Sequence, residues 1–207
     1  AFNGARVLGP AVAGAVLAYS NSTSGPFIFD DSVVVQNNPR IYYLWPPWKA
    51  VLQPTRPVAD YTFALNYAMS GFNKPADYHA TNVLIHVLVG LLLFGVVRRT
   101  LLLPRWGGRF QSPAPWLAAA IATLWTVHPL QTESVTYIAQ RIEALMGLFY
   151  LLTLYCFIRG VTGAHPRRWL NSALLACLLG MGTKEMTVTL PVAVWLYDWL
   201  FVADSFR

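Results

Sequence analysis

Two adjacent carboxylates, Asp30 and Asp31, have the clearest capacity for chemistry in this chain, and they follow the apolar run GPFIF at residues 25–29. If this segment folds against a membrane, the two carboxylates cannot both be comfortably solvated. One of them would then be a natural general base. The structural alternative is a turn or a helix N-cap followed by Ser32. The sequence leaves open which of the two would be the base.

Cations that could bind an anionic substrate lie further along the chain. Arg141 is close to the start of an apolar segment, where a charge is costly unless it is paired or faces a ligand anion. Glu133, eight residues earlier, could form a structural ion pair with it, and a phosphate contact is the alternative. The candidates for contacting a substrate or an anion such as phosphate are Arg56, Arg141, Lys184, Glu185, His128 and Glu133.

Three further polar residues, His79, Asn82 and His86, share one helical face at spacings of three and four residues. Because polar side chains are costly inside a membrane, this face should point into the bundle. The two histidines would lie roughly 10.5 Å apart along the helix axis, too far to share one zinc ion with bonds of about 2.0–2.1 Å. We therefore predict no metal site, and hydrogen bonds between helices compete with a role at a substrate.

Composition indicates the environment in which these residues act. Of 207 residues, 56% are hydrophobic, 14% aromatic and only 12% charged, and the mean hydropathy is +0.44. These values argue against a water-soluble enzyme and against a disordered or nucleic-acid-binding chain. The net charge of +6 comes from arginine clusters between apolar runs, a pattern typical of membrane orientation. Cys156 and Cys177 both lie in apolar stretches, so no disulfide framework is implied.

The predicted fold is all-α: a single polytopic transmembrane helix bundle, 1–207, with about six spans. A signal peptide is the competing interpretation of the first apolar segment. The predicted spans cover residues 7–19, 78–97, 116–127, 137–158, 169–182 and 186–201.

The loops predict how the bundle is oriented. The loops after residues 97 and 158 carry arginines without acids, so the positive-inside rule makes them cytoplasmic. Residues 20–77 then form a large first external loop on the non-cytoplasmic side. Within that loop, 41–48 (IYYLWPPW) is expected at headgroup level and 56–73 as an amphipathic helix lying in the interface.

Four blocks in order carry a family resemblance. They are FDDSVVVQNNP (29–39), RPVADYTFALNYAMSGFNKPADYHATNVLIH (56–86), HPLQTESVTYIAQRIEAL (128–145) and GTKEMTVTLPVAVWLYD (182–198). Together they resemble the membrane part of the transmembrane O-mannosyltransferases that carry tetratricopeptide repeats, and their bacterial relatives. That family is similar to the protein O-mannosyltransferases and belongs to the GT-C class of membrane glycosyltransferases.

The resemblance implies a polyprenyl-phosphate sugar as donor substrate, a hydroxyl on a protein as acceptor, and no cofactor or obligatory metal. It also implies an acidic catalytic residue in the first external loop, a position that Asp30 and Asp31 match. Family members continue through further spans, so we expect this chain to correspond to the amino-terminal membrane part only. The expected location is the bacterial inner membrane or the endoplasmic reticulum.

Two alternatives to a transferase remain open from the sequence. A non-catalytic membrane subunit of a larger complex would pack against other membrane subunits or bind membrane lipid. A transporter-like carrier of lipid-linked sugar is the other possibility, although the chain shows no inverted repeat.

Overall fold

The computed structural model describes residues 4–46 and 56–203, and every regular element in these ranges is helical. The longer helices are α1 (Gly4–Tyr19), α3 (Pro57–Ser70), α4 (Pro75–Leu101), α5 (Ala114–Thr126), α6 (Thr132–Thr136), α7 (Arg141–Thr162), α8 (Pro166–Met181) and α9 (Leu190–Tyr197). Short helical turns link them: η1 (Ser20–Ser24), η2 (Ser32–Gln36), η3 (Pro39–Tyr42), η4 (Pro104–Trp106), η5 (Pro129–Gln131), η6 (Ile138–Gln140), η7 (Glu185–Thr189) and η8 (Asp198–Val202). The all-α prediction is confirmed for the described residues.

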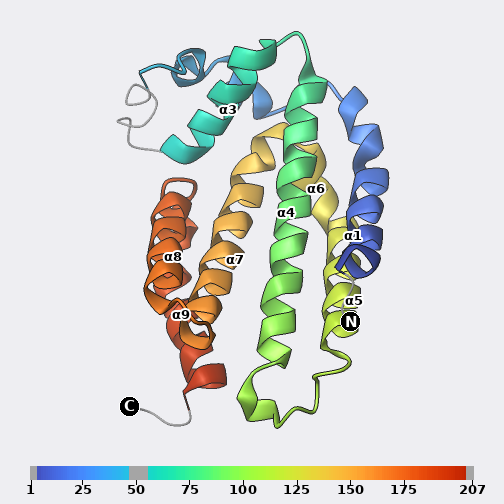
Figure 1. Ribbon diagram of the computed structural model, residues 1–207. Helices are drawn as coiled ribbons and strands as arrows, with labels where there is room; N and C mark the ends of the chain where they lie inside the picture. Colours follow the sequence, from blue (N-terminus) through green and yellow to red (C-terminus); the bar gives the residue numbers. More distant parts are fainter. Residues whose placement is uncertain (1–3, 47–55, 204–207) are drawn as a thin grey trace.

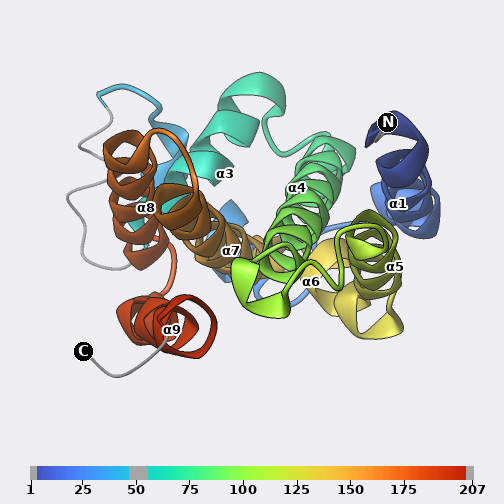
Figure 2. The same cartoon turned by 60° about the horizontal axis from the view of Figure 1, so that its bottom comes forward.

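Helix α4 lies in the middle of the bundle (Figure 1). It packs against α5 and α1 on one side and against α7 on the other, and α8 covers α7. Figure 2 shows α9 beyond α7, away from α4. Because α4 contacts α1 and α5 on one side and α7 on the other, its side chains largely determine how these two groups of helices pack.

Local sequence signals set the helix boundaries. Pro57, Pro75 and Pro166 each occupy the first position of a helix, where the missing N–H has no partner to lose. Between α3 and α4 the chain turns at Gly71, whose φ of 58° belongs to the region that favours glycine. Arg98 and Arg99 lie in the last turn of α4, where cations interact favourably with the helix dipole.

Small residues allow α4 to approach its neighbours closely. A Cβ at Gly90 would lie 2.6 Å from Oγ1 of Thr126 on α5. Such contacts are typical of helices packed in membranes, where small residues let the backbones come together. A core cluster of Phe94 with Ala118, Ala119 and Ala122 continues the same interface between α4 and α5.

The number of membrane spans is confirmed only in part. Three described stretches are long and apolar enough to cross a membrane: Pro75–Leu101, Ile138–Thr162 and Glu185–Val202. The other predicted spans correspond to the shorter helices α1, α5 and α8, of 16, 13 and 16 residues. Six spans therefore stay a prediction. The predicted span 137–158 corresponds to the stretch Ile138–Thr162, which begins with the turn η6 and continues directly as α7.

The two ends of the bundle differ in charge. At one end, which we call the carboxylate end, the turns η1 to η3 and α3 meet the turns around residues 127–140 and 182–189. The amide of Val58, for example, donates to the carbonyl of Gly182 at 2.9 Å. At the other end, the arginine end, lie the connections from α4 to α5 and from α7 to α8, which include Arg105 and follow Arg99 and Arg159 in sequence (Figure 1). Both arginine-rich loops are thus on one side of the bundle, as their charge predicts.

Helix α3 forms within the predicted helical segment and lies at an angle to α4 (Figure 1). Its polar side chains Asp60 and Asn66 are buried, whereas Leu65 and Met69 are exposed. An apolar surface of α3 therefore faces outward, as an interfacial helix requires. The position of this helix in the membrane interface stays a prediction. In the aromatic segment before it, Tyr43 and Trp45 are exposed, and Trp48 lies outside the described residues.

Candidate active site at the carboxylate end

Asp31 is almost completely buried, with 1% of its surface exposed. Its Oδ2 accepts from the amide of Ile28 at 3.0 Å, and its Oδ1 accepts from the amide of Ala139 at 2.7 Å. Burial raises the pKa of Asp31, and these two amides together with His79 oppose that rise. Because both carboxylate oxygens accept hydrogen bonds from backbone N–H groups, Asp31 attaches the segment after α1 to η6.

Asp30 has the opposite environment, since it is exposed. Its backbone amide donates to the Tyr137 hydroxyl at 2.7 Å, and the ring of Tyr137 contacts that of Phe29 edge to face. The residue is thus fixed through its main chain while its carboxylate stays accessible. Adjacent in sequence, the two carboxylates are therefore placed for different tasks.

A cavity of about 500 Å³ opens beside this segment. The residues that line it are Val33, Val34, Arg40, Arg56, Asp60, Ile142 and Glu185. Val33 and Val34 come directly after the segment that carries Asp30 and Asp31, although neither aspartate lines the cavity itself. The remaining walls come from η3, the start of α3, α7 and η7, so the cavity brings together parts of the chain far apart in sequence.

The charged side chains of this cavity are paired. Nε of Arg40 lies 3.1 Å from Oδ2 of Asp60, and the Nδ2 of Asn38 donates to Oδ1 of Asp60 at 3.0 Å. Burial raises the pKa of Asp60, opposed mainly by the charge of Arg40. Across the cavity Arg56 forms an ion pair with Glu185 at 3.4 Å. Two guanidinium groups thus face a space large enough for a small ligand.

Arg141 directly precedes Ile142, which lines this cavity, but Arg141 itself does not line it. Its side chain is fully buried, and its Nε donates to Oδ1 of Asn82 at 2.8 Å. The terminal nitrogens donate to the carbonyls of Thr62 and Tyr78 at 3.1 and 3.0 Å, and the guanidinium lies 4.3 Å from the ring centre of Phe63. Neutral oxygens and an aromatic face therefore stabilise this cation. The sequence had suggested an ion pair with Glu133 or a contact with a phosphate instead.

The residues around Lys184 hold the cavity wall in place. Lys184 forms an ion pair with Glu143 on α7, which binds the turn before η7 to the bundle. Glu185, the next residue, thereby reaches Arg56. Glu185 lines the cavity, whereas Lys184 does not.

The face of α4 that carries His79, Asn82 and His86 is buried in the bundle. Nε2 of His79 lies 3.1 Å from the carbonyl of Gly25, and Nε2 of His86 lies 2.8 Å from that of Thr126. The Nδ2 of Asn82 approaches the carbonyls of Val135, Tyr137 and Ile138. Each of these side chains therefore binds a carbonyl of a neighbouring segment.

His128, just before η5, and Glu133, in α6, are exposed and do not line the cavity. Nδ1 of His128 accepts from the amide of Leu130 at 3.2 Å, which caps η5. Oε1 of Glu133 accepts from Nε2 of Gln140 at 3.4 Å. Among the residues that the structure describes, no three His, Cys, Asp or Glu side chains are grouped to hold a metal ion.

The structure thus joins two of the predicted phosphate ligands, Arg56 and Glu185, with two residues that sequence reasoning missed, Arg40 and Asp60. Arg40 lies between α1 and α3, as Asp30 does, and its charge is visible in the sequence. Asp60 was visible as an acid in the first turn of a helix, but its burial depends on the fold of the loop around Asn38. A periodicity argument could not supply that information.

No protein-family model and no solved structure matches this chain. It is 29% identical over 202 residues to the protein O-mannosyl-transferase TMTC4 of Homo sapiens, a match that covers 84% of this chain and 27% of the relative. Identity to TMTC1 of Homo sapiens is 31% over 206 residues, covering 87% and 22%. Tmtc2 of Drosophila melanogaster is 26% identical over 204 residues, covering 89% and 20%.

The chain therefore spans between 20% and 27% of the length of these relatives. Similarity to several of them extends over most of the chain, from 84% to 94% of its length. On this evidence the chain belongs to a protein O-mannosyl-transferase-like family of membrane proteins.

Proposed function

We propose that this chain forms the acceptor-activating and phosphate-binding part of a membrane glycosyltransferase. The observation that carries the proposal is the contrast between an accessible Asp30 and a buried Asp31 beside a cavity that holds Arg40 and Arg56. The names of the relatives support a sugar transfer to protein. The donor would be a polyprenyl-phosphate sugar, and neither a metal nor another cofactor is needed for the steps below.

Asp30 is the general base in this proposal. Its carboxylate accepts the proton of an acceptor hydroxyl as the oxygen attacks the anomeric carbon of the sugar. The bond between that carbon and the phosphate oxygen breaks, and its electron pair stays on the phosphate. Asp31 positions the base, because both of its oxygens are already bound to the amides of Ile28 and Ala139.

Arg40 and Arg56 stabilise the negative charge that develops on the leaving phosphate. Their present partners, Asp60 and Glu185, keep both guanidinium groups at the cavity when no phosphate is bound. Arg141 acts indirectly, since it holds α7 against α3 and α4 and so positions Ile142 in the cavity wall. Lys184 does the same for Glu185 through its pair with Glu143.

The proposed orientation in the membrane is based on the positive charge of the arginine end. The positive-inside rule places that end in the cytoplasm, so the candidate active site faces the periplasm or the lumen of the endoplasmic reticulum. The acceptor protein would then meet Asp30 on the non-cytoplasmic side. His128 and Glu133 lie on the same side and could contact the acceptor.

A transfer assay with the full-length protein in membranes tests the proposal. Arg40→Gln with Arg56→Gln should raise the KM for a polyprenyl-phosphate sugar, and Asp30→Asn should lower kcat with little change in that KM. Asp198→Asn, at the arginine end, is a matched control with unchanged transfer. If the arginine variants transfer sugar with normal KM, the cavity does not bind the donor phosphate.

A further inference from the structure

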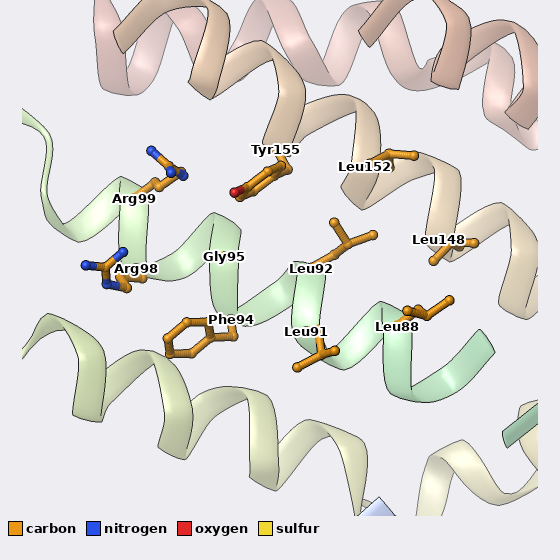
Figure 3. Close-up of a pocket in the computed structure, with 10 residues that line it drawn as sticks. All are labelled: Leu88, Leu91, Leu92, Phe94, Gly95, Arg98, Arg99, Leu148, Leu152 and Tyr155. Carbon is orange, nitrogen blue, oxygen red and sulfur yellow. The ribbon is translucent and has the colours of Figure 1, made fainter. Parts of the chain in front are cut away.

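Two cavities meet at the arginine end, far from the candidate active site. The first is a largely apolar groove of about 480 Å³ between α4 and α7 (Figure 3). The second is a more polar cavity of about 640 Å³, lined in part by Arg105, Thr162 and Phe201. Arg99 lines both, so the two cavities adjoin at this side chain.

Leucine side chains from two helices form the groove. Figure 3 shows Leu88 and Leu92 of α4 on the side of α7, with Leu148 opposite them. Leu88 is 41% exposed, so the groove is accessible at this point. From Leu88 to Arg99 the groove extends about 16 Å along the axis of α4. That length matches one leaflet, half of a hydrocarbon core about 30 Å thick.

Arg99 is held at the charged end of the groove. Its guanidinium lies 5.2 Å from the ring centre of Tyr155, whose hydroxyl accepts from Arg159 at 3.4 Å. A Cβ at Gly95 would come within 2.8 Å of the Tyr155 ring, so glycine at this position lets the ring lie against α4. Arg105 is positioned over the ring of Phe201, with its guanidinium 5.8 Å from the ring centre.

Charge and size together define what would fit these cavities. No carboxylate is among the described residues that line either of them, so the arginines favour an anion. A helix about 10 Å wide would need more than about 1,200 Å³ over the same 16 Å, over twice the volume of the groove. A single hydrocarbon chain is narrower and needs no hydrogen bonds from the leucine walls.

We propose that the arginine end binds one anionic membrane phospholipid. One acyl chain lies in the groove between α4 and α7, and the phosphate of the headgroup lies between Arg99 and Arg105. The lipid fills the groove and neutralises the arginine cluster, which stabilises the contact between the two helices. This proposal is independent of any sugar transfer at the carboxylate end.

Photo-crosslinking in detergent tests the site with the full-length protein. The probes are phosphatidylglycerol and phosphatidylcholine, each with a diazirine on one acyl chain. Phosphatidylglycerol should bind more tightly and should crosslink to peptides that contain residues 88–95 or 148–155. Arg99→Gln with Arg105→Gln should weaken its binding about 25-fold, taking about fivefold for each arginine. The same positions changed to Lys should keep most of the binding, because the charge remains.

Matched controls separate the site from general effects. Arg167→Gln with Arg168→Gln removes two exposed arginines from the start of α8, outside both cavities, and should leave binding unchanged. Leu148→Trp should fill the groove and reduce crosslinking, whereas Leu174→Trp on the exposed face of α8 should not. Thermal unfolding of each variant confirms that the proteins compared are folded.

Several results would overturn the proposal. Equal binding of the two lipids, or crosslinks that map outside the groove, would exclude a specific anionic lipid site. Full competition by glycerol phosphate, with no effect of Leu148→Trp, would show a phosphate site without an acyl groove. Crosslinks between the groove and another polypeptide segment would identify a protein occupant instead.

Discussion

Asn82 accepts a hydrogen bond from the buried guanidinium of Arg141, with Nε and Oδ1 2.8 Å apart. The same Asn82 amide donates to the carbonyl of Tyr137, whose hydroxyl accepts from the amide of Asp30. Asp31 binds the amide of Ala139 in the same segment. Through Tyr137, these contacts link a charge inside the bundle to the main chain of Asp30, the candidate base.

Loss of the Arg141 side chain should destabilise the protein strongly. Arg141→Ala leaves the oxygens of Asn82, Thr62 and Tyr78 without their donors and creates a cavity beside Phe63. We expect a loss of about 3–5 kcal/mol in the free energy of unfolding, the scale for breaking a buried charged network. Arg168→Ala, at an exposed position, should change it by less than about 0.5 kcal/mol. Denaturation in detergent measures both, and equal stabilities would contradict the assigned role of Arg141.

Substituting alanine should have opposite effects at two glycines, one in the close contact between α4 and α5 and one on an open face of α7. Gly90→Ala places a methyl group 2.6 Å from Oγ1 of Thr126 and should cost about 1–3 kcal/mol. At Gly147 on α7 a Cβ meets nothing within 4 Å, so Gly147→Ala should stabilise by about 0.5–1 kcal/mol. Thermal unfolding of the two variants is the measurement. A Gly90→Ala protein as stable as the wild type would show that these helices do not pack as described.

Asp60 predicts a specific pH dependence of stability. Since burial raises its pKa in the folded protein, the folded state binds this proton more tightly than the unfolded state. Stability contributed by that proton is therefore present at low pH and is lost as the pH rises through the folded pKa. Asp60→Asn cannot titrate at this position. As the pH falls from about 7 to about 4, the wild type should therefore become more stable relative to this variant. Melting temperatures of both proteins at several pH values test this, and a constant difference would show that Asp60 titrates normally.

Labelling of single cysteines tests the orientation of the bundle. In a protein whose two natural cysteines are replaced, Thr23→Cys and Ser112→Cys are exposed positions at the two ends. An impermeant maleimide should label Ser112→Cys only after access to the cytoplasmic side and Thr23→Cys only from the other side. Labelling of both from the same side would refute the arrangement.

The sequence predicted most helices because apolar runs, prolines and arginine clusters are local signals. Proline starts α3, α4 and α8, and the arginines at the end of α4 mark its boundary. The contact that Asp31 makes with the amide of Ala139 in η6 was not visible, because it joins two distant segments of the chain. Local patterns do not contain contacts of that kind.

The candidate site was predicted less completely for the same reason. Asp30 and Glu185 were visible as charged residues next to apolar runs, and Arg56 only as a further cation in a polar loop. The partners of Arg141 did not, because they are mainly backbone carbonyls and an amide, which leave no pattern of charged side chains. Assigning different environments to Asp30 and Asp31 also required the fold, since adjacent residues of one type differ only through their neighbours.

The rate of sugar transfer in Asp30→Asn, compared with Asp31→Asn, tests the proposed function most directly. The full-length proteins would be assayed in membranes with a polyprenyl-phosphate sugar and an acceptor peptide, and rates would be expressed per folded protein. We predict that Asp30→Asn lowers transfer by about 10² to 10⁴ fold with an unchanged melting temperature. Asp31→Asn should instead lower the melting temperature, because an amide cannot accept from both Ile28 and Ala139, and its folded fraction should retain most transfer. Wild-type transfer by Asp30→Asn would contradict the account.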